Sequence, residues 1–134
     1  QGEPLAVILA DLDHFKVLND THGHDAGDRA LRTFARVLRR AVRDADLVCR
    51  YGGEEFIVVC PGSDKYSASL VFDRVRMELE ATLGDGRTPP FTVSAGIADS
   101  GDAADFGDMI TLADVALLQA KAAGRNRVQL NAGV

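Results

Sequence analysis

The sequence has little cysteine, no tryptophan and no long apolar run. Only two of its 134 residues are cysteine, which is too few for a disulfide scaffold and favours a reducing, cytoplasmic environment. The longest purely apolar runs, Ala6–Ala10 and Ile57–Cys60, are far shorter than the roughly 18 residues of a membrane span. A content of 46% hydrophobic and 26% charged residues is typical of a globular protein. We therefore expect one domain over residues 1–134, without direct membrane contact.

Positive charge is also in deficit. The chain carries 15 Lys and Arg against 20 Asp and Glu, a formal net charge of −5. This balance argues against a general nucleic-acid-binding protein, which would normally be basic. The basic residues are nevertheless unevenly spread, because one short stretch holds six of them: Arg29, Arg32, Arg36, Arg39, Arg40 and Arg43. Apart from its last member, this arginine stripe is expected to be a solvated helix face.

Hydrophobic periodicity predicts an α+β fold in which helices flank a mixed sheet of about five strands. Residues Leu5–Leu12 are apolar on both faces, which indicates a central strand covered on two sides. Asp13 is expected to cap a following short helix, and Gly124 to end the last long helix. The other strands are expected over residues 47–51, 56–59, 91–98 and 127–130, and the helices over residues 14–20, 25–42, 64–81 and 106–123.

The second and third strands are expected to form a hairpin around the sequence Gly-Gly-Glu-Glu at residues 52–55. Centring the turn on these four residues places Cys49 opposite Val58. Because Cys60 then has a different partner, a disulfide between Cys49 and Cys60 is not expected.

Three carboxylates carry the first indication of chemistry. Asp11 lies at the end of a buried apolar strand, where a carboxylate is costly unless it is paired, hydrogen-bonded or bound to a metal. Taken alone, Asp11 could cap nearby backbone N–H groups, and Glu54 and Glu55 could form a plain charged turn. If the strand of Asp11 neighbours the hairpin, the three carboxylates converge. Such clusters suit Mg²⁺ or Mn²⁺, which commonly serve phosphoryl or nucleotidyl transfer.

Seven short segments together resemble the GGDEF domain of the diguanylate cyclase family, in its Glu variant. The resemblance extends in order over nearly the whole chain. One part of the family pattern is absent: a helix and a D-x-L-T-G-L-x-N-R segment usually precede the first strand. The matching segments are Asp11-Leu12-Asp13-His14-Phe15-Lys16, Asn19-Asp20, Gly23-His24-Asp25-Ala26-Gly27-Asp28, Gly52-Gly53-Glu54-Glu55-Phe56, Thr92-Val93-Ser94-Ala95-Gly96-Ile97-Ala98, Ala113-Asp114-Val115-Ala116-Leu117 and Ala120-Lys121-Ala122-Ala123-Gly124-Arg125-Asn126.

The resemblance implies a fold related to nucleotide cyclases and the palm of nucleotide polymerases, and it implies a reaction. Two GTP condense into cyclic di-GMP, a bacterial second messenger, and two pyrophosphates are released. Each domain holds one GTP, so two copies must face each other as a homodimer. An upstream sensory domain, outside this sequence, would control the activity.

The resemblance also assigns residues. Asp11, Glu54, Glu55 and the backbone carbonyl of Leu12 would hold two Mg²⁺ or Mn²⁺ ions per GTP, and Glu54 would be the base for the 3′-hydroxyl. Backbone N–H groups around Phe15 open a helix and suit phosphate. The cationic side chains expected to contact the phosphates are Lys16, Lys121 and Arg125. The last two could equally offset a helix C-terminal dipole, and both roles are compatible.

Asn19 and Asp28 would recognise guanine. A carboxylate can accept from guanine N1–H and N2–H₂, whereas adenine lacks this pair of donors, which favours GTP over ATP. Asp28 could also simply be an acidic residue in the first turn of a helix. His24 would brace the loop or touch the nucleotide. A zinc site is the less favoured interpretation of the local histidines and acids, since no cysteine joins them: His14, His22, His24, Asp11, Asp13 and Asp25.

Arg43 and Asp46 resemble the RxxD inhibitory site of the family. They would bind cyclic di-GMP as product, with a secondary contact from Arg74 on the following helix. The planar guanidinium of arginine suits this role because it both hydrogen-bonds and stacks. Outside this context an R-x-x-D pattern usually forms an ion pair at a helix end.

Three classes of function follow from the sequence. The favoured one is an active, GTP-specific diguanylate cyclase with product inhibition, weakly active unless dimerised. The second is a sensor module that binds GTP or cyclic di-GMP without turnover. The third is a regulatory dimerisation domain that binds no nucleotide.

Overall fold

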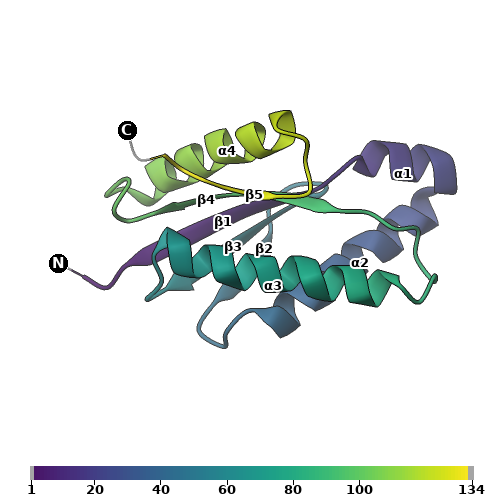
Figure 1. The fold of residues 1–134 in the computed structure, drawn as a ribbon, viewed down its shortest axis with the longest axis horizontal. Coiled ribbons are helices and arrows are strands. Elements are labelled where there is room, and N and C mark those ends of the chain that lie inside the picture. Colours follow the sequence, from purple (N-terminus) through teal and green to yellow (C-terminus); the bar gives the residue numbers. More distant parts are fainter. Residues whose placement is uncertain (1, 133–134) are drawn as a thin grey trace.

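A computed structural model describes residues 2–132, which form one five-stranded sheet in the order β2-β3-β1-β4-β5 (Figure 1). All neighbouring strands are antiparallel except β4 and β5, which are parallel. This mixed sheet confirms the predicted α+β fold class. The elements in chain order are β1 (Leu5–Leu12), α1 (Phe15–His22), α2 (His24–Ala41), β2 (Leu47–Arg50), β3 (Glu55–Pro61), α3 (Lys65–Leu83), β4 (Val93–Asp99), α4 (Phe106–Ala122) and β5 (Val128–Leu130).

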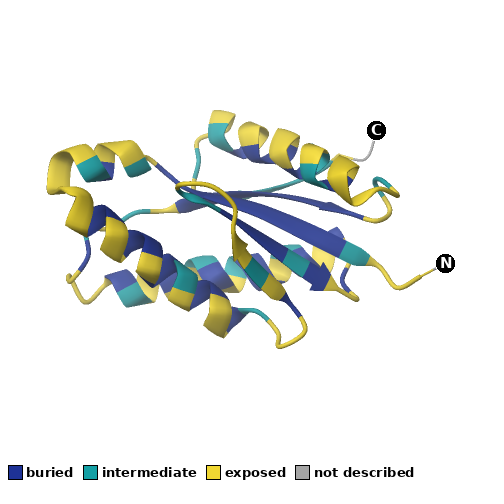
Figure 2. Ribbon diagram, turned by 180° about the vertical axis from the view of Figure 1, so that it is seen from behind, coloured by how far each residue is buried: buried dark blue, intermediate teal, exposed yellow. Residues whose placement is uncertain are grey.

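Strand β1 is the centre of the sheet and is buried on both faces, as its sequence predicts. Ala6, Ile8 and Ala10 belong to the larger core, which α2 and α3 cover. Val7 and Leu9 belong to a second core under α4. Figure 1 shows α4 on one side of the sheet and α2 and α3 on the other, and Figure 2 shows the sheet buried between exposed helix surfaces. The central strand therefore places its C-terminal end between two packed layers.

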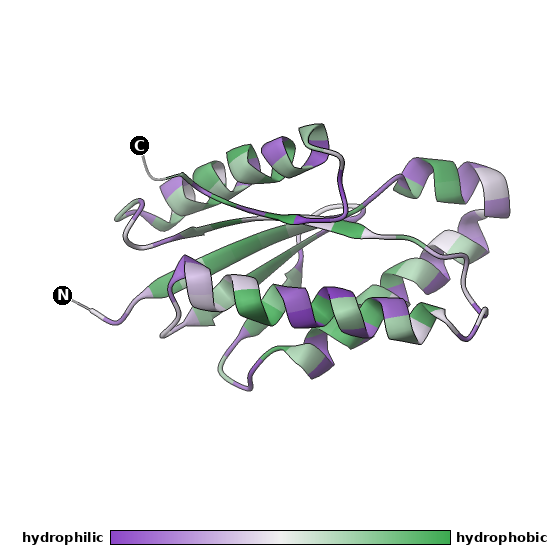
Figure 3. Cartoon of the chain, viewed as in Figure 1, coloured by the Kyte–Doolittle hydropathy of each residue, from purple (hydrophilic) through white to green (hydrophobic). Residues whose placement is uncertain are grey.

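The helices contribute apolar stripes to these cores. The apolar stripe of α2 is buried, and the ring of its Phe34 meets Phe56 of β3 edge to face, with ring centroids 5.1 Å apart. Figure 3 shows β1 as a continuous apolar strand, whereas the helices alternate between apolar and polar surface. Leu70 of α3, in contrast, is 69% exposed. Over residues 2–132, no helix is both long and apolar enough to cross a bilayer.

The hairpin register differs by one residue from the prediction. Cys49 lies opposite Ile57, and Val58 pairs with Val48. The cause is an asymmetric turn, in which the Glu55 carbonyl accepts from the N–H groups of both Tyr51 and Gly52, at 2.7 and 3.3 Å. As a result, Glu55 is the first residue of β3 and not part of the turn.

The two cysteines are free and lie in different environments. Cys49 is exposed on β2, whereas Cys60 is buried on β3. Burial, with the nearby Asp46 carboxylate, raises the pKa of the Cys60 thiol to about 12. The expected absence of a Cys49–Cys60 disulfide thus agrees with the structure.

The polar segment after β4 also begins later than expected. Asp99 follows the strand expected over residues 91–98, but it is the last residue of β4 and is buried. Its carboxylate accepts from the backbone N–H of Lys65 at 2.8 Å and of Gly101 at 2.9 Å. These hydrogen bonds compensate its burial and join the start of α3 to the sheet.

Close packing of β4 against α4 depends on Gly96. A Cβ at this position would lie 2.1 Å from the Ala113 carbonyl oxygen and 2.3 Å from the Leu117 nitrogen, both backbone atoms. We expect Gly96→Ala to lower the free energy of unfolding by at least about 2 kcal/mol, because a helix backbone must move. Urea denaturation measures this. Gly53→Ala, where a Cβ meets nothing within 4 Å, is the control; equal unfolding midpoints for the two variants would contradict the prediction.

Candidate active site at the end of strand β1

Asp11 places a carboxylate at the buried end of β1. It is 4% exposed, and the ammonium of Lys121, from the last turn of α4, donates to Oδ2. The other oxygen, Oδ1, is buried and has no hydrogen-bond partner within residues 2–132. Burial raises the pKa of Asp11, and Lys121 partly offsets this effect. An unpartnered buried oxygen of this kind is a ready acceptor for a cation or a donor group.

Glu54 approaches Asp11 from the hairpin turn. The Glu54 carbonyl accepts from the N–H of Leu12, at 3.3 Å, which ties the turn to the end of β1. Desolvation raises the pKa of the Glu54 carboxyl, with a second contribution from the charge of Asp11. Both side chains line a cavity of about 230 Å³, together with Lys121 and Arg125. Acidic and basic side chains thus surround one hollow.

The third carboxylate does not join them. Glu55 is paired with Asp11 in the register of β1 and β3, but it does not line the cavity. Within residues 2–132, no group of three His, Cys, Asp or Glu side chains is placed to hold a metal ion. The three carboxylates therefore do not gather at one cavity in the described residues, although Glu55 is the cross-strand neighbour of Asp11.

Asp13 has a different role from the one expected. His14, not Asp13, is the N-cap residue of α1. The buried Asp13 carboxylate accepts from the hydroxyls of Thr92 (2.6 Å) and Ser94 (2.7 Å), and from the backbone N–H of Asn126 (3.0 Å). It therefore joins the ends of β1 and β4 to the segment between α4 and β5. Sequence reasoning missed this because an Asp before a helix fits the capping rule equally well.

The backbone around this carboxylate is strained. His14, Arg125 and Asn126 have φ values of 55°, 63° and 51°, in the left-handed region that costs non-glycine residues energy. The hydrogen bond from Asn126 to Asp13 holds part of this conformation. All three residues adjoin the cavity or line it, so the strain is concentrated at the candidate site.

The residues expected to contact phosphates line the cavity. Phe15 and Lys16 line it from the first turn of α1. No side chain caps this turn, since His14 makes no capping hydrogen bond. Lys16 is exposed, and Arg125 is half-buried. The arrangement presents a helix N-terminus and three cations toward one hollow.

The residues expected to recognise guanine lie outside the cavity, where α1 meets α2. The Asn19 side chain packs against Gly27, where a Cβ would lie 1.7 Å from Asn19 Oδ1. This oxygen is buried without a hydrogen-bond partner in the described part of the chain. Asp28 and His24 are exposed on the first turns of α2. Gly27 is a residue that sequence reasoning missed, although a glycine inside an amphipathic helix could have indicated close packing.

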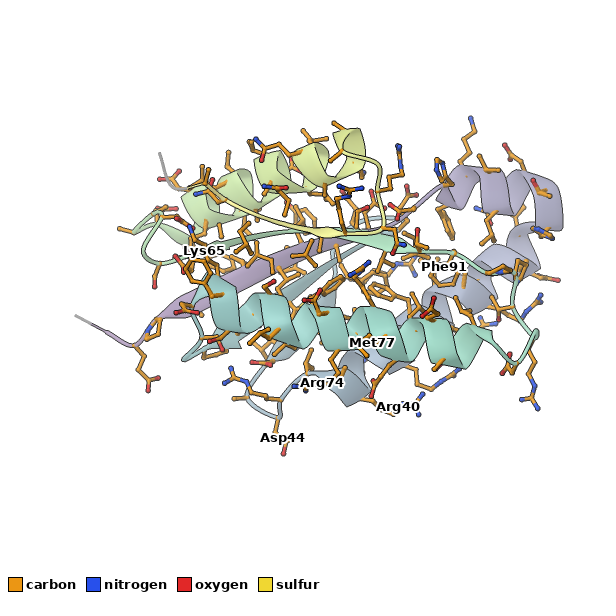
Figure 4. The ribbon with its side chains drawn as sticks, viewed as in Figure 1. Arg40, Asp44, Lys65, Arg74, Met77 and Phe91 are labelled. Atoms are coloured by element: carbon orange, nitrogen blue, oxygen red, sulfur yellow. The ribbon has the colours of Figure 1, made fainter. Side chains whose placement is uncertain are left out.

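The expected inhibitory residues lie at the opposite end of α2. Asp46, whose side chain is fully buried, accepts from Nε and Nη2 of Arg43 at 3.3 and 2.8 Å. Arg74 of α3 donates to the Ala41 carbonyl at 3.1 Å. Figure 4 shows Arg74 on the same side of the molecule as Arg40 and Asp44. Arg74 is thus anchored at Ala41, two residues before Arg43, and Arg43 forms an ion pair with Asp46.

A larger cavity lies elsewhere. It measures about 460 Å³ and lies between α3 and residues 90–93, beside Met77 and Phe91, both labelled in Figure 4. Its lining is mostly apolar, with Glu80 as its one acidic residue. We place the candidate active site at the smaller cavity because that cavity holds the desolvated carboxylates.

The donor set around Asp11 fits a divalent cation such as Mg²⁺ or Mn²⁺. Two carboxylates with raised pKa values and one unpartnered buried oxygen face the cavity, and oxygen is the ligand that these hard cations prefer. The alternative zinc site lacks support, because His22 and His24 lie outside the cavity.

Comparison with known proteins identifies the family. Residues 1–127 match the family described as "Diguanylate cyclase, GGDEF domain". The response regulator PleD of Caulobacter vibrioides is 42% identical over 132 residues, covering 95% of this chain and 29% of that protein. The chain therefore spans less than a third of this relative. It belongs to the GGDEF family, as the resemblance in the sequence predicts.

Solved structures agree. The active GGEEF domain of a diguanylate cyclase from Vibrio cholerae matches with a TM-score of 0.87 and 32% identity, over 96% of this chain and 83% of that one. The GGDEF domain of DgcB from Caulobacter crescentus, in complex with c-di-GMP, matches with a TM-score of 0.83 and 31% identity, over 96% and 78%. The fold is thus that of diguanylate cyclase domains.

The ion pair between Asp11 and Lys121 predicts a change in titration. We expect Lys121→Met to raise the pKa of Asp11 further, because burial would then act without compensation. A raised folded-state pKa means that this carboxyl stabilises the fold below its unfolded pKa, and that the contribution is lost as the pH rises through the folded-state pKa. The variant should therefore lose more stability than the parent as the pH rises.

Carboxyl NMR titration measures this pKa directly. Lys16→Met is the matched control, because Lys16 lines the same cavity but makes no ion pair within the described residues. An unchanged Asp11 pKa in Lys121→Met would show that the ion pair does not act on this carboxyl.

Proposed function

We propose that this domain is an active diguanylate cyclase that condenses two GTP into cyclic di-GMP and two pyrophosphates. The observation that carries the proposal is the desolvated pair Asp11 and Glu54, one with an unpartnered oxygen, beside Lys121 in one cavity. The family and the solved relatives named above support it. Each 3′-hydroxyl oxygen attacks the α-phosphorus of the other GTP, and the bond to the departing pyrophosphate breaks.

Cyclases of this family generally depend on a metal. We propose two Mg²⁺ or Mn²⁺ ions per GTP, held by Asp11, Glu54, the Leu12 carbonyl and, after a movement of its side chain, Glu55. Bound there, they would neutralise triphosphate charge and make the 3′-hydroxyl more acidic. Of the three carboxylates that line the cavity, Glu54 is the best base, since Lys121 occupies Asp11 and three hydrogen bonds occupy Asp13. Its raised pKa brings it closer to the range suited to accepting a proton.

The other residues of the site bind and orient the nucleotide. Lys16, Lys121 and Arg125 would contact the β- and γ-phosphates, supported by the uncapped N-terminus of α1 at Phe15. The unpartnered Oδ1 of Asn19 and the exposed carboxylate of Asp28 would accept from the guanine edge, with His24 beside them.

The reaction requires two copies of the domain. One cavity of about 230 Å³ bears one set of phosphate-binding groups, so each copy would hold one GTP. The two copies must face each other to bring each 3′-hydroxyl to the other α-phosphate. We therefore propose a homodimer as the working form, with little turnover by an isolated copy.

Product inhibition is proposed at the Arg43 surface. Asp46 fixes the Arg43 guanidinium through a two-point ion pair, while 45% of the Arg43 side chain stays exposed. A fixed planar cation of this kind suits the phosphate and guanine faces of cyclic di-GMP, with Arg74 as a second contact. The cyclic di-GMP complex of the DgcB domain shows that a related domain binds this molecule.

The first test is product formation. The chain is fused to a dimerising coiled coil, incubated with GTP and Mg²⁺, and cyclic di-GMP is measured by chromatography. We expect Glu54→Ala to lower turnover by at least about 100-fold, because general-base catalysis alone contributes about 10²–10⁴-fold. Its melting temperature should stay near that of the parent.

Glu78→Ala is the matched control, because Glu78 is exposed on α3, away from the cavity. Near-normal product from Glu54→Ala would contradict the assignment of Glu54. Cyclic di-GMP binding without any product from the parent would favour the second candidate, a sensor module. This candidate draws on the Arg43 surface, which lies apart from the cavity.

The second test concerns inhibition. We expect Arg43→Ala to raise the cyclic di-GMP concentration needed for half-inhibition by at least about tenfold, because a charge-assisted two-point contact is lost. Initial rates with added cyclic di-GMP measure this. Arg39→Ala is the control, because Arg39 is exposed one turn earlier and forms no ion pair in the described residues. It should change the concentration for half-inhibition little. Equal inhibition of Arg43→Ala and the parent would contradict the proposed site.

A further inference from the structure

Four arginines meet at a cavity that is separate from both sites described above. Arg29, Arg32 and Arg36 of α2 and Arg87 of the α3–β4 loop line this cavity of about 280 Å³. It shares no lining residue with the cavity of Asp11. We refer to it as the arginine cavity; its other lining residues are Thr33, Thr82, Leu83, Asp85 and Thr88.

The spacing of the three helical arginines brings them to one face. Positions separated by three and four residues lie above one another on an α-helix. The opposite wall comes from the end of α3 and the following loop, which is held by buried Thr88 and by Leu83. Thr33 of α2 is also buried at the floor. Arg87 is thus presented toward α2 by packed elements, although 51 residues separate it from Arg36.

The arginine cavity has an unbalanced charge. Within residues 2–132, none of its four guanidinium groups forms an ion pair. The one lining carboxylate, Asp85, accepts from the backbone N–H of Arg87 through Oδ1. Four of the fifteen basic residues therefore surround one hollow in a chain whose net charge is −5. Like charges gathered around one cavity repel one another, and a bound anion would relieve the repulsion.

We propose that the arginine cavity binds a small anion that carries two or more phosphate groups. Guanidinium groups present paired donors that match phosphate oxygens, and several of them suit a multiply charged ligand. The hydroxyls of Thr82 and Thr88 add further donors. The inference does not depend on the proposed cyclase activity, because it rests on other residues.

The chemistry of the lining argues against a nucleic acid strand. Single-stranded binding surfaces combine positive charge with aromatic side chains on which bases stack. Among the described residues that line the arginine cavity, none is aromatic. Four cationic side chains also gather at one hollow, as a compact ligand requires. The arginine cavity also lies near the proposed guanine contact. Arg32 is one helical turn from Asp28, so an anion bound in the cavity would lie beside that contact.

The test uses NMR of the full chain with tripolyphosphate as the probe and EDTA present. We expect amide shifts at Thr33 and Arg87, and saturable binding that weakens as KCl is raised. The double variant Arg32→Gln/Arg36→Gln should bind at least about tenfold more weakly, and Arg87→Gln should also weaken binding. Arg39→Gln removes a charge from the same helix outside the cavity and should change the affinity less than about twofold.

Several outcomes would overturn the proposal. Shifts confined to the amides of Phe15, Lys16 and Arg125 would place the probe in the candidate active site. If Arg39→Gln weakened tripolyphosphate binding as much as the double variant does, or if Arg87→Gln did not weaken it, the probe would be attracted to the helix by its general charge. Tighter binding of a single-stranded oligonucleotide than of tripolyphosphate would also overturn it. A GTP titration of Glu54→Ala in EDTA then distinguishes a nucleotide from an inorganic polyphosphate as the source of the phosphate groups. Amide shifts at Thr33 and Arg87 would identify a nucleotide as an acceptable ligand.

Discussion

The buried carboxylate of Asp13 is the interaction on which the rest of the candidate site depends. Its two oxygens accept from Thr92, Ser94 and the backbone of Asn126, and so join three segments that are far apart in sequence. Without it, a buried polar cluster would lose its acceptor, and such losses cost about 1–3 kcal/mol for each unsatisfied group. Its hydrogen bond with the Asn126 N–H also helps to hold that residue in a left-handed conformation.

The position of Asp11 follows from this arrangement. Strand β1 is covered on both faces, so a carboxylate at its end is desolvated. The backbone hydrogen bond between Leu12 and Glu54 brings a second acidic residue to the same cavity. The fold thereby holds two like charges close together, at a cost to stability. Charged groups with such unfavourable environments are concentrated at functional sites. Here Lys121 offsets part of the cost of burying Asp11.

The sequence predicts the sheet and its central strand because apolar residues on both faces of Leu5–Leu12 have one physical explanation. It also indicates Asp11, since a buried carboxylate needs a partner. It does not predict the role of Asp13, because helix capping and a tertiary hydrogen-bond cluster call for the same residue type. The hairpin register fails for a similar reason: it depends on which N–H groups the Glu55 carbonyl accepts. The arginine cavity needs Arg87 beside α2, and only tertiary packing supplies that proximity.

Lys121 connects the stability of the site to its proposed use. One ammonium group cannot fully neutralise Asp11 and a phosphate group at once, since each draws on the same positive charge. In the chain without nucleotide, Lys121 binds Asp11 and reduces the cost of its burial. On the proposed function, phosphate groups entering the cavity compete for Lys121 and free the second oxygen of Asp11. Asp11 then becomes a better ligand for a cation when the nucleotide is present, so binding of the two is mutually favourable through this one side chain.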